Sequence, residues 1–111
     1  MVRPRALKTG AVVAGSLSPR LRFMAQEGLA YAQEESGQLD AAITAFGALA
    51  DEAKNAGNFY RDRALFNKAR VLQRKGDAKE AEKTYRAILA EIPTTSLKDE
   101  ITDRLALLEG K

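Results

Sequence analysis

The chain has 111 residues, a formal charge of +3, and neither cysteine nor histidine. A chain of this length forms one domain with a modest core. The two missing residue types exclude disulfides, thiolate nucleophiles, thiolate metal sites and the imidazole base on which most hydrolytic triads depend. We therefore predict a protein that is not an enzyme and that uses no metal, no cofactor and no small-molecule substrate.

The positive charge is concentrated at the start of the chain. Residues 1–22 carry five basic side chains and no acidic one, so the remainder is slightly acidic. We expect residues 1–17 to form a basic leader that is flexible or weakly helical, because short basic arms are usually solvated tails. Its apolar stretch, Ala11–Ala14, falls far below the ~20 residues that cross a bilayer, and we expect a soluble chain. The leader also resembles the start of a signal peptide, with an apolar region about half the usual length.

The first predicted helix spans Pro19 to about Glu35. Ser18 supplies a capping hydroxyl, Pro19 suits the first helical position, and Gly37 permits the left-handed turn that ends a helix. Apolar residues then recur at spacings of three and four, which predicts one stripe facing the core. The stripe contains Leu21, Met24, Ala25, Leu29 and Ala32.

Two further helices follow. The second begins at about Leu39 and ends before Asn55–Asn58, a run of turn-forming residues. Its stripe contains Leu39, Ala42, Ile43, Phe46, Leu49, Ala50 and Ala53. The third runs from about Phe59 to Arg74 and ends at Lys75-Gly76. Its inward residues are Leu65, Ala69 and Leu72.

The last two helices have recognisable starts. Asp77 and Glu80 form a capping-box pattern, in which the first side chain accepts a helix N–H and the second reaches back. That fourth helix should end at Pro93, which cannot continue a helix. The fifth helix has Ser96 as its expected cap. Its apolar edge contains Leu97, Ile101, Leu105 and Leu108. With no segment predicted as a strand, the fold class is all-α.

A repeat becomes visible when the first two helices are laid over the next two. Gly37 is followed at five residues by Ala42 and at nine by Phe46, and Gly76 is followed likewise by Ala81 and Tyr85. The two glycines are 39 residues apart. One helical hairpin per period of this length is typical of a short α-solenoid. Phe46 and Tyr85, inward aromatics at helical spacing, are predicted to be core residues.

The second unit, Asp62 to Pro93, resembles the tetratricopeptide repeat. Seven positions fit the motif: Leu65, Ala69, Leu72, Gly76, Ala81, Tyr85 and Pro93. Lys68 and Ile88 depart from it. The first unit fits less closely, through Ala30, Gly37, Ala42 and Phe46. This resemblance implies two helical hairpins at residues 18–57 and 58–95, a capping helix at residues 96–111, and a scaffold that binds a protein or peptide.

Two segments suggest a narrower resemblance within that family. Gly28–Gly37 and Arg104–Gly110 are similar to bacterial repeat proteins of the ancillary Sec-translocon and cell-division-coordinator type. Such proteins are usually anchored in the inner membrane with their repeats in the periplasm. The resemblance therefore implies a membrane-associated complex on the periplasmic side, with the cytoplasm as the other location. A homo-oligomer is a further option.

The resemblance also implies a concave groove lined by the first helix of each pair. The groove residues would be Glu27, Tyr31, Glu34, Arg63, Phe66, Asn67, Arg70 and Arg74. On one interpretation the arginines bind carboxylates of a peptide while Tyr31 and Phe66 hold an apolar side chain. On the other, the glutamates Glu27, Glu34 and Glu35 pair with the arginines Arg63, Arg70 and Arg74 across neighbouring helices.

An alternative function uses charge rather than the groove. The basic leader and the arginines of the third helix could contact nucleic acid or an anionic membrane. Binding of that kind weakens steeply with salt, because each neutralised phosphate releases counterions.

Overall fold

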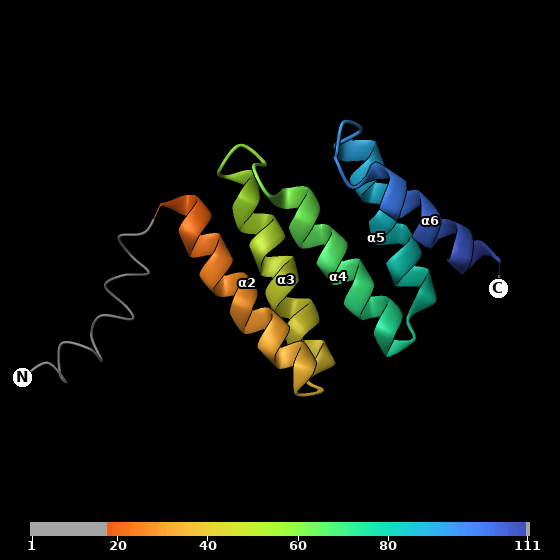
Figure 1. Ribbon diagram of the computed structural model, residues 1–111, viewed down its shortest axis with the longest axis horizontal. Coiled ribbons are helices and arrows are strands. Elements are labelled where there is room, and N and C mark those ends of the chain that lie inside the picture. The colour runs from red at the N-terminus through yellow and green to blue at the C-terminus, as the bar shows by residue number, and fades with distance from the viewer. Residues whose placement is uncertain (1–17, 111) are drawn as a thin grey trace, which may run out of the picture.

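The computed structural model describes residues 18–110, which contain five helices and no strand (Figure 1). The helices are α2 (Pro19–Glu35), α3 (Leu39–Lys54), α4 (Arg61–Lys75), α5 (Ala78–Glu91) and α6 (Lys98–Glu109). The predicted all-α fold is confirmed. The predicted leader at residues 1–17 lies outside the described residues.

Each helix packs on the next one along the chain, in antiparallel order (Figure 1). Consequently α2, α4 and α6 follow one another across one face, with their amino-terminal ends at the same edge (Figure 1). We call this surface the α2–α4–α6 face. Two antiparallel helix pairs closed by a single helix form the short α-solenoid that the repeat predicts.

The turns between helices follow from local sequence. Ser18 Oγ accepts a hydrogen bond from the Leu21 N–H at 3.3 Å and so caps α2. Gly76 has φ of 100°, a left-handed conformation that glycine adopts at little cost, and ends α4. The connection between α3 and α4 holds two consecutive left-handed residues, Gly57 and Asn58. Phe59 belongs to this loop, and α4 begins at Arg61 rather than at the predicted Phe59.

Two predicted caps need correction. Asp77 Oδ1 accepts from the Glu80 N–H at 3.3 Å, but the Asp77 N–H donates to Leu72 O at 2.9 Å, so the capping box is only half formed. Ser96 makes no cap, and α6 begins at Lys98. No side chain caps α6, whose N-cap residue is Leu97, and the Thr95 hydroxyl accepts from the Leu97 N–H at 3.1 Å just ahead of the helix.

The core contains both predicted aromatics. Phe46 and Tyr85 are completely buried, which confirms the prediction. Ala42 and Ala81 are also completely buried. An alanine at a buried helix contact lets the two backbones approach closely.

The face that α2 buries is the reverse of the predicted one. Leu21, Met24 and Leu29 are 50%, 49% and 69% exposed, and Ala25 and Ala32 are exposed as well. The buried residues of α2 are Phe23, Glu27, Ala30 and Glu34. Stacking on Tyr60, at 3.9 Å between ring centroids, accounts for the burial of Phe23. The stripe with more apolar residues thus lies on the outside.

A buried arginine joins three helices. Arg61 is 6% exposed, and its Nη1 donates to Ala50 O of α3 at 2.8 Å. Its Nε and Nη2 bind the Glu91 carboxylate of α5 at 2.8 and 3.2 Å. The pKa of Glu91 is held below its usual value by this hydrogen bonding to Arg61. Such a planar, two-pronged contact fixes where α4 starts relative to its neighbours.

Candidate functional site

The contact between α2 and α4 is made by ion pairs. Glu27 of α2 is 4% exposed, and its two oxygens accept from Arg63 Nε and Nη2 at 2.7 and 2.8 Å. Asn67 Nδ2 adds a longer hydrogen bond to the same carboxylate at 3.4 Å. A carboxylate that leaves water requires such partners, so the geometry explains how α2 can bury an acidic residue.

Glu34 lies two turns further along α2 and binds two arginines. Its oxygens accept from Arg70 Nη1 and Nη2 at 2.6 and 2.7 Å, and from Arg74 Nη1 at 3.2 Å. Hydrogen bonding to Arg70 lowers the pKa of Glu34, and the same contact raises the pKa of Arg70. One carboxylate facing two guanidinium groups leaves a positive excess at this end of the helix pair.

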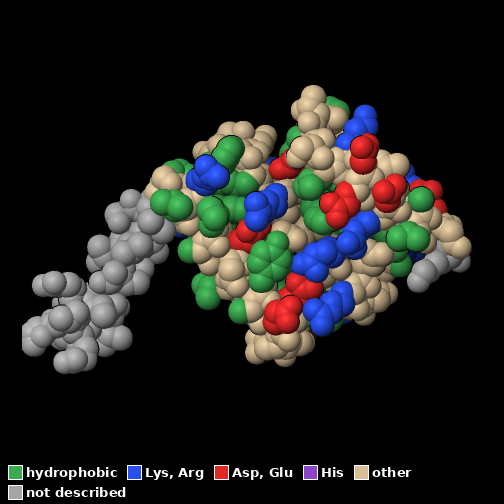
Figure 2. Space-filling model, in the orientation of Figure 1, with side chains coloured by type: hydrophobic (Ala, Val, Ile, Leu, Met, Phe, Trp, Pro, Cys, Tyr) green, Lys and Arg blue, Asp and Glu red, His purple; other side chains and the backbone are tan. Residues whose placement is uncertain are grey.

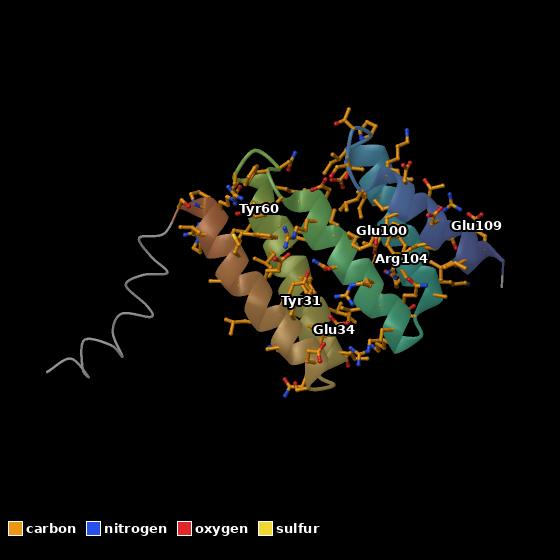
Figure 3. The ribbon with its side chains drawn as sticks, viewed as in Figure 1. Tyr31, Glu34, Tyr60, Glu100, Arg104 and Glu109 are labelled. Carbon is orange, nitrogen blue, oxygen red and sulfur yellow. The ribbon has the colours of Figure 1, made fainter. Side chains whose placement is uncertain are left out.

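Aromatic rings cover the arginines from the α2 side. The Arg70 guanidinium carbon lies 5.9 Å from the centroid of the Tyr31 ring, and Arg63 lies equally far from Phe23. Contacts at this distance are favourable when the cation is over the ring face. Tyr31 is 36% exposed and packs edge-on against Phe46. Figure 3 shows Tyr31 and Glu34 on the α2 side of α4.

On the other side of α4, α6 supplies another arginine. Arg104 lies 5.4 Å above the Phe66 ring, and its Nη1 donates to Gln73 Oε1 at 3.3 Å. Tyr85 donates its hydroxyl to the same oxygen at 3.1 Å. Within residues 18–110 no carboxylate lies within ion-pairing distance of Arg104. Figure 3 shows Arg104 close to α4, with Glu100 one turn earlier on α6.

Four arginines therefore cross the α2–α4–α6 face, and we call them the arginine row. They are Arg63, Arg70, Arg74 and Arg104. Figure 2 shows basic side chains gathered across the middle of this face with acidic ones beside them. Two buried glutamates oppose the first three arginines, so the row retains a positive excess suited to carboxylates.

A hollow of about 460 Å³ lies at the edge of this face where α2 and α4 begin. Its apolar lining includes Phe59, which is 63% exposed, and the stacked pair Phe23 and Tyr60. Its charged lining comprises Arg20, Asp62 and Arg63. Met24, Ser96 and Leu97 complete it. Aromatic walls with a few polar groups at the rim are typical of sites that take an apolar side chain.

Sequence comparison assigns the fold to a family. Two models, both described as tetratricopeptide repeat, match residues 24–56 and residues 62–95. Together the matched segments cover more than half of the chain. The chain belongs to the tetratricopeptide repeat family. No curated protein and no solved structure matches it. Tetratricopeptide repeats are generally non-catalytic modules that bind proteins or peptides.

The two matches place one tetratricopeptide repeat on α2 and α3 and the other on α4 and α5. The narrower likeness to translocon and cell-division proteins finds no support in them. Within residues 18–110, none of the helices combines the length and the hydrophobicity that a membrane span requires. In that same region no group of three or more acidic side chains is placed to hold a metal ion.

The eight predicted groove residues divide into two sets in these repeats. Glu27, Glu34, Phe66 and Asn67 are buried. Tyr31, Arg63, Arg70 and Arg74 remain at least partly exposed. The pairing interpretation is confirmed for Glu27 with Arg63 and for Glu34 with Arg70 and Arg74. Glu35 takes part in no ion pair within the described helices.

Sequence reasoning missed the hollow and Arg104. Phe59 and Tyr60 stand directly after a turn-forming run, and two adjacent aromatics in such a place could have indicated an exposed site. No pattern in the sequence around Arg104 indicates a functional role, because its position over Phe66 depends on how α6 packs. The alternative function finds no support in these contacts, since all four arginines of α4 pair with glutamates and the basic leader lies outside the described residues.

Proposed function

We propose that the chain is a scaffold that binds a protein partner across the α2–α4–α6 face. An apolar side chain of the partner enters the hollow, and acidic residues beside it meet the arginine row. The observation that carries this proposal is the exposure of Phe59 in an aromatic hollow beside Arg20 and Arg63. An aromatic ring left this exposed gains from burial by a partner.

The arrangement of the arginines on the face favours a partner whose acidic residues are spaced along its surface. Arg63 Nε and Nη2 hold Glu27, and Arg70 holds Glu34 with both of its terminal nitrogens. Arg74 has a half-exposed side chain, and Arg104 has no ion pair within residues 18–110. These two arginines are the ones best placed to bind a new carboxylate, in the bidentate geometry that arginine favours.

Site-specific photo-crosslinking tests the proposal. A photo-reactive amino acid at Phe59 should capture a partner in cells of the source organism, and Arg104→Glu should reduce that capture. The matched control carries the same amino acid at Thr44, an exposed residue of α3 that lies outside the face. Equal capture at Thr44, or no capture at Phe59, would contradict this assignment of the binding surface.

We further propose, on the resemblance of Gly28–Gly37 and Arg104–Gly110, that this partner belongs to a cell-envelope complex. The crosslinked product should then sediment with membranes and be released by detergent. A product found only in the cytosolic fraction would remove this narrower assignment while leaving the binding face in place.

A further inference from the structure

The outer side of α2 carries a continuous apolar stripe. Four small or aliphatic residues recur at spacings of four and three, so they share one side of the helix: Leu21, Ala25, Gly28 and Ala32. Met24 flanks them on one side and Leu29 on the other. All six are exposed, and four of the six large exposed apolar residues in the described region belong to α2. We call these six residues the outer stripe.

Apart from Met24, which lines the hollow, nothing within the chain's described residues explains the composition of the outer stripe. Gly28 stands in the middle of a helix, where glycine costs about 0.5 to 1 kcal/mol relative to alanine. A Cβ added at Gly28 would meet no atom within 4 Å, so no internal contact requires the glycine. A glycine between alanines instead permits another helix to approach closely.

The charges of α2 run opposite to its dipole. Its first turn has no acidic residue and its last turn no basic one. Arg20 stands near the positive end and Glu35 at the negative end, an order that disfavours the isolated helix. Neither side chain takes part in an ion pair within residues 18–110. An antiparallel α2 helix of a second copy would bring its Glu35 carboxylate close to Arg20 of the first.

We propose that two copies of this chain associate through an antiparallel contact between their α2 helices. When Ala25 is placed level with Gly28 of the second copy, Leu21 stands level with its Ala32 and Met24 with its Leu29. Larger side chains then stand level with smaller ones at the outer positions. Arg20 and Glu35 lie on the same flank of the stripe and come within about one helical turn of each other across the contact.

A second copy of the chain complements the outer stripe better than an unrelated helix does, because the contact between two copies is symmetric. A two-fold contact is self-complementary, so each feature must meet its counterpart on the same surface. The outer stripe has that property, because Ala25 and Gly28 lie at its centre, Leu21 at one end meets Ala32 of the other end, and opposite charges stand at its two ends. This inference rests on the outer stripe and not on the proposed function, although two residues of the contact, Arg20 and Met24, also line the hollow.

The first test is the oligomeric state measured by analytical ultracentrifugation over a range of concentrations. The full chain should show a monomer–dimer equilibrium, and Gly28→Arg should weaken the dimer at least tenfold. Thr44→Arg is the control, since it adds the same charge at an exposed site on α3. Gly28→Arg should keep its helical circular dichroism, because a side chain at that position has open space. A chain that stays monomeric to ~1 mM would overturn the proposal.

Charge reversal tests the orientation. Arg20→Glu and Glu35→Arg should each weaken the dimer severalfold, and the double variant should restore it, because the new charges complement each other across the two-fold axis. Both single changes improve the match with the helix dipole, so unfolding would not account for a loss. Failure of the double variant to recover would exclude the antiparallel arrangement.

Disulfide crosslinking tests the register of the contact. Because the chain contains no cysteine, the introduced cysteines are its only thiols. Chains with Ala25→Cys mixed with chains with Gly28→Cys should oxidise mainly to the mixed dimer. A parallel contact would give the two symmetric dimers instead and would overturn the proposal. Photo-crosslinking at Phe59 in the Gly28→Arg chain reports on the binding face separately, because Gly28 does not line the hollow, so failure of either inference can be recognised.

Discussion

The helices α2 and α4 both open a tetratricopeptide repeat, yet most residues that α4 buries are apolar, whereas half of those that α2 buries are glutamates. The central helix α4 contacts helices on both sides and buries eight of its residues, including Leu65, Ala69 and Leu72. The terminal helix α2 buries four, and two of these are glutamates. A helix covered on both sides needs apolar residues around most of its circumference. A terminal helix needs only one such side, so ionic contacts can hold it and an apolar stripe can remain outside.

The ion pairs between these helices should produce the largest loss of stability. Changing both Arg63 and Arg70 to alanine leaves Glu27 and Glu34 buried without their main partners. Removing one member of a buried pair costs about 3 to 5 kcal/mol, so the double variant should lose several kcal/mol in urea unfolding. Arg86→Ala is the control, because its pairs with Glu82 and Glu109 are exposed and worth about 0 to 1 kcal/mol. Equal stability of the two variants would show that the interior pairs are not structural.

Packing within the better-matched repeat should come next in size. Ala81 is completely buried on α5, and Ala81→Leu should destabilise the chain by about 1 to 3 kcal/mol because it overpacks the helix contact. Ala90→Leu makes the same change at an exposed position of α5 and should leave the melting temperature nearly unchanged. An Ala81→Leu chain that melts with the parent would contradict the close approach of the two helices.

Lowering the pH should weaken two contacts of α4: the contact with α2 through Glu34 and the contact with α5 through Glu91. The pKa of Glu34 and that of Glu91 are lowered in the folded chain from an ordinary value of 4.5. Their stabilisation is therefore complete above that value and is lost as the pH falls through the lower folded pKa. Urea unfolding at about pH 7 and about pH 3 should show this loss, and Glu34→Gln should make it smaller. An unaltered pH dependence in Glu34→Gln would assign the acid sensitivity to other groups.

The outer stripe should contribute least to the stability of one copy. Leu29 is 69% exposed, so Leu29→Gln should change the unfolding free energy by no more than about 0.5 kcal/mol at concentrations where the chain is monomeric. Phe23→Ala on the buried side should instead cost about 3 to 5 kcal/mol. A large effect of Leu29→Gln in the monomer would mean that the stripe is covered from within the chain.

Several features of the chain could be predicted because they depend on neighbours in the sequence. Ser18 and Pro19 begin α2, Gly76 ends α4, and Pro93 lies just after α5. Spacings of three and four residues identify the helices, and the period between Gly37 and Gly76 identifies their order. The buried positions of α4 and α5 also follow from the motif, since the apolar residues there lie on the sides that their neighbours cover.

The buried side of α2 could be predicted only in part, because the expected pairing of Glu27 and Glu34 with arginines did not indicate that these glutamates are buried. The number of apolar residues on each side of α2 favours burial of the stripe with Leu21 and Leu29. Burial of the other side depends on arginines 36 residues away in sequence. They are Arg63 for Glu27 and Arg70 for Glu34. The hollow likewise needs Phe23, Phe59 and Leu97 to come together from three parts of the chain.

The sequence by itself therefore determined the helices, the capped start of α2, the glycine end of α4, the repeat and the family, because propensity, capping and periodicity act over a few residues. Only the tertiary structure decided which side of a terminal helix is buried, which glutamates lie inside, and where an aromatic hollow forms. Those outcomes depend on contacts between distant segments. Burying a carboxylate is favourable only when such a contact supplies its guanidinium partner.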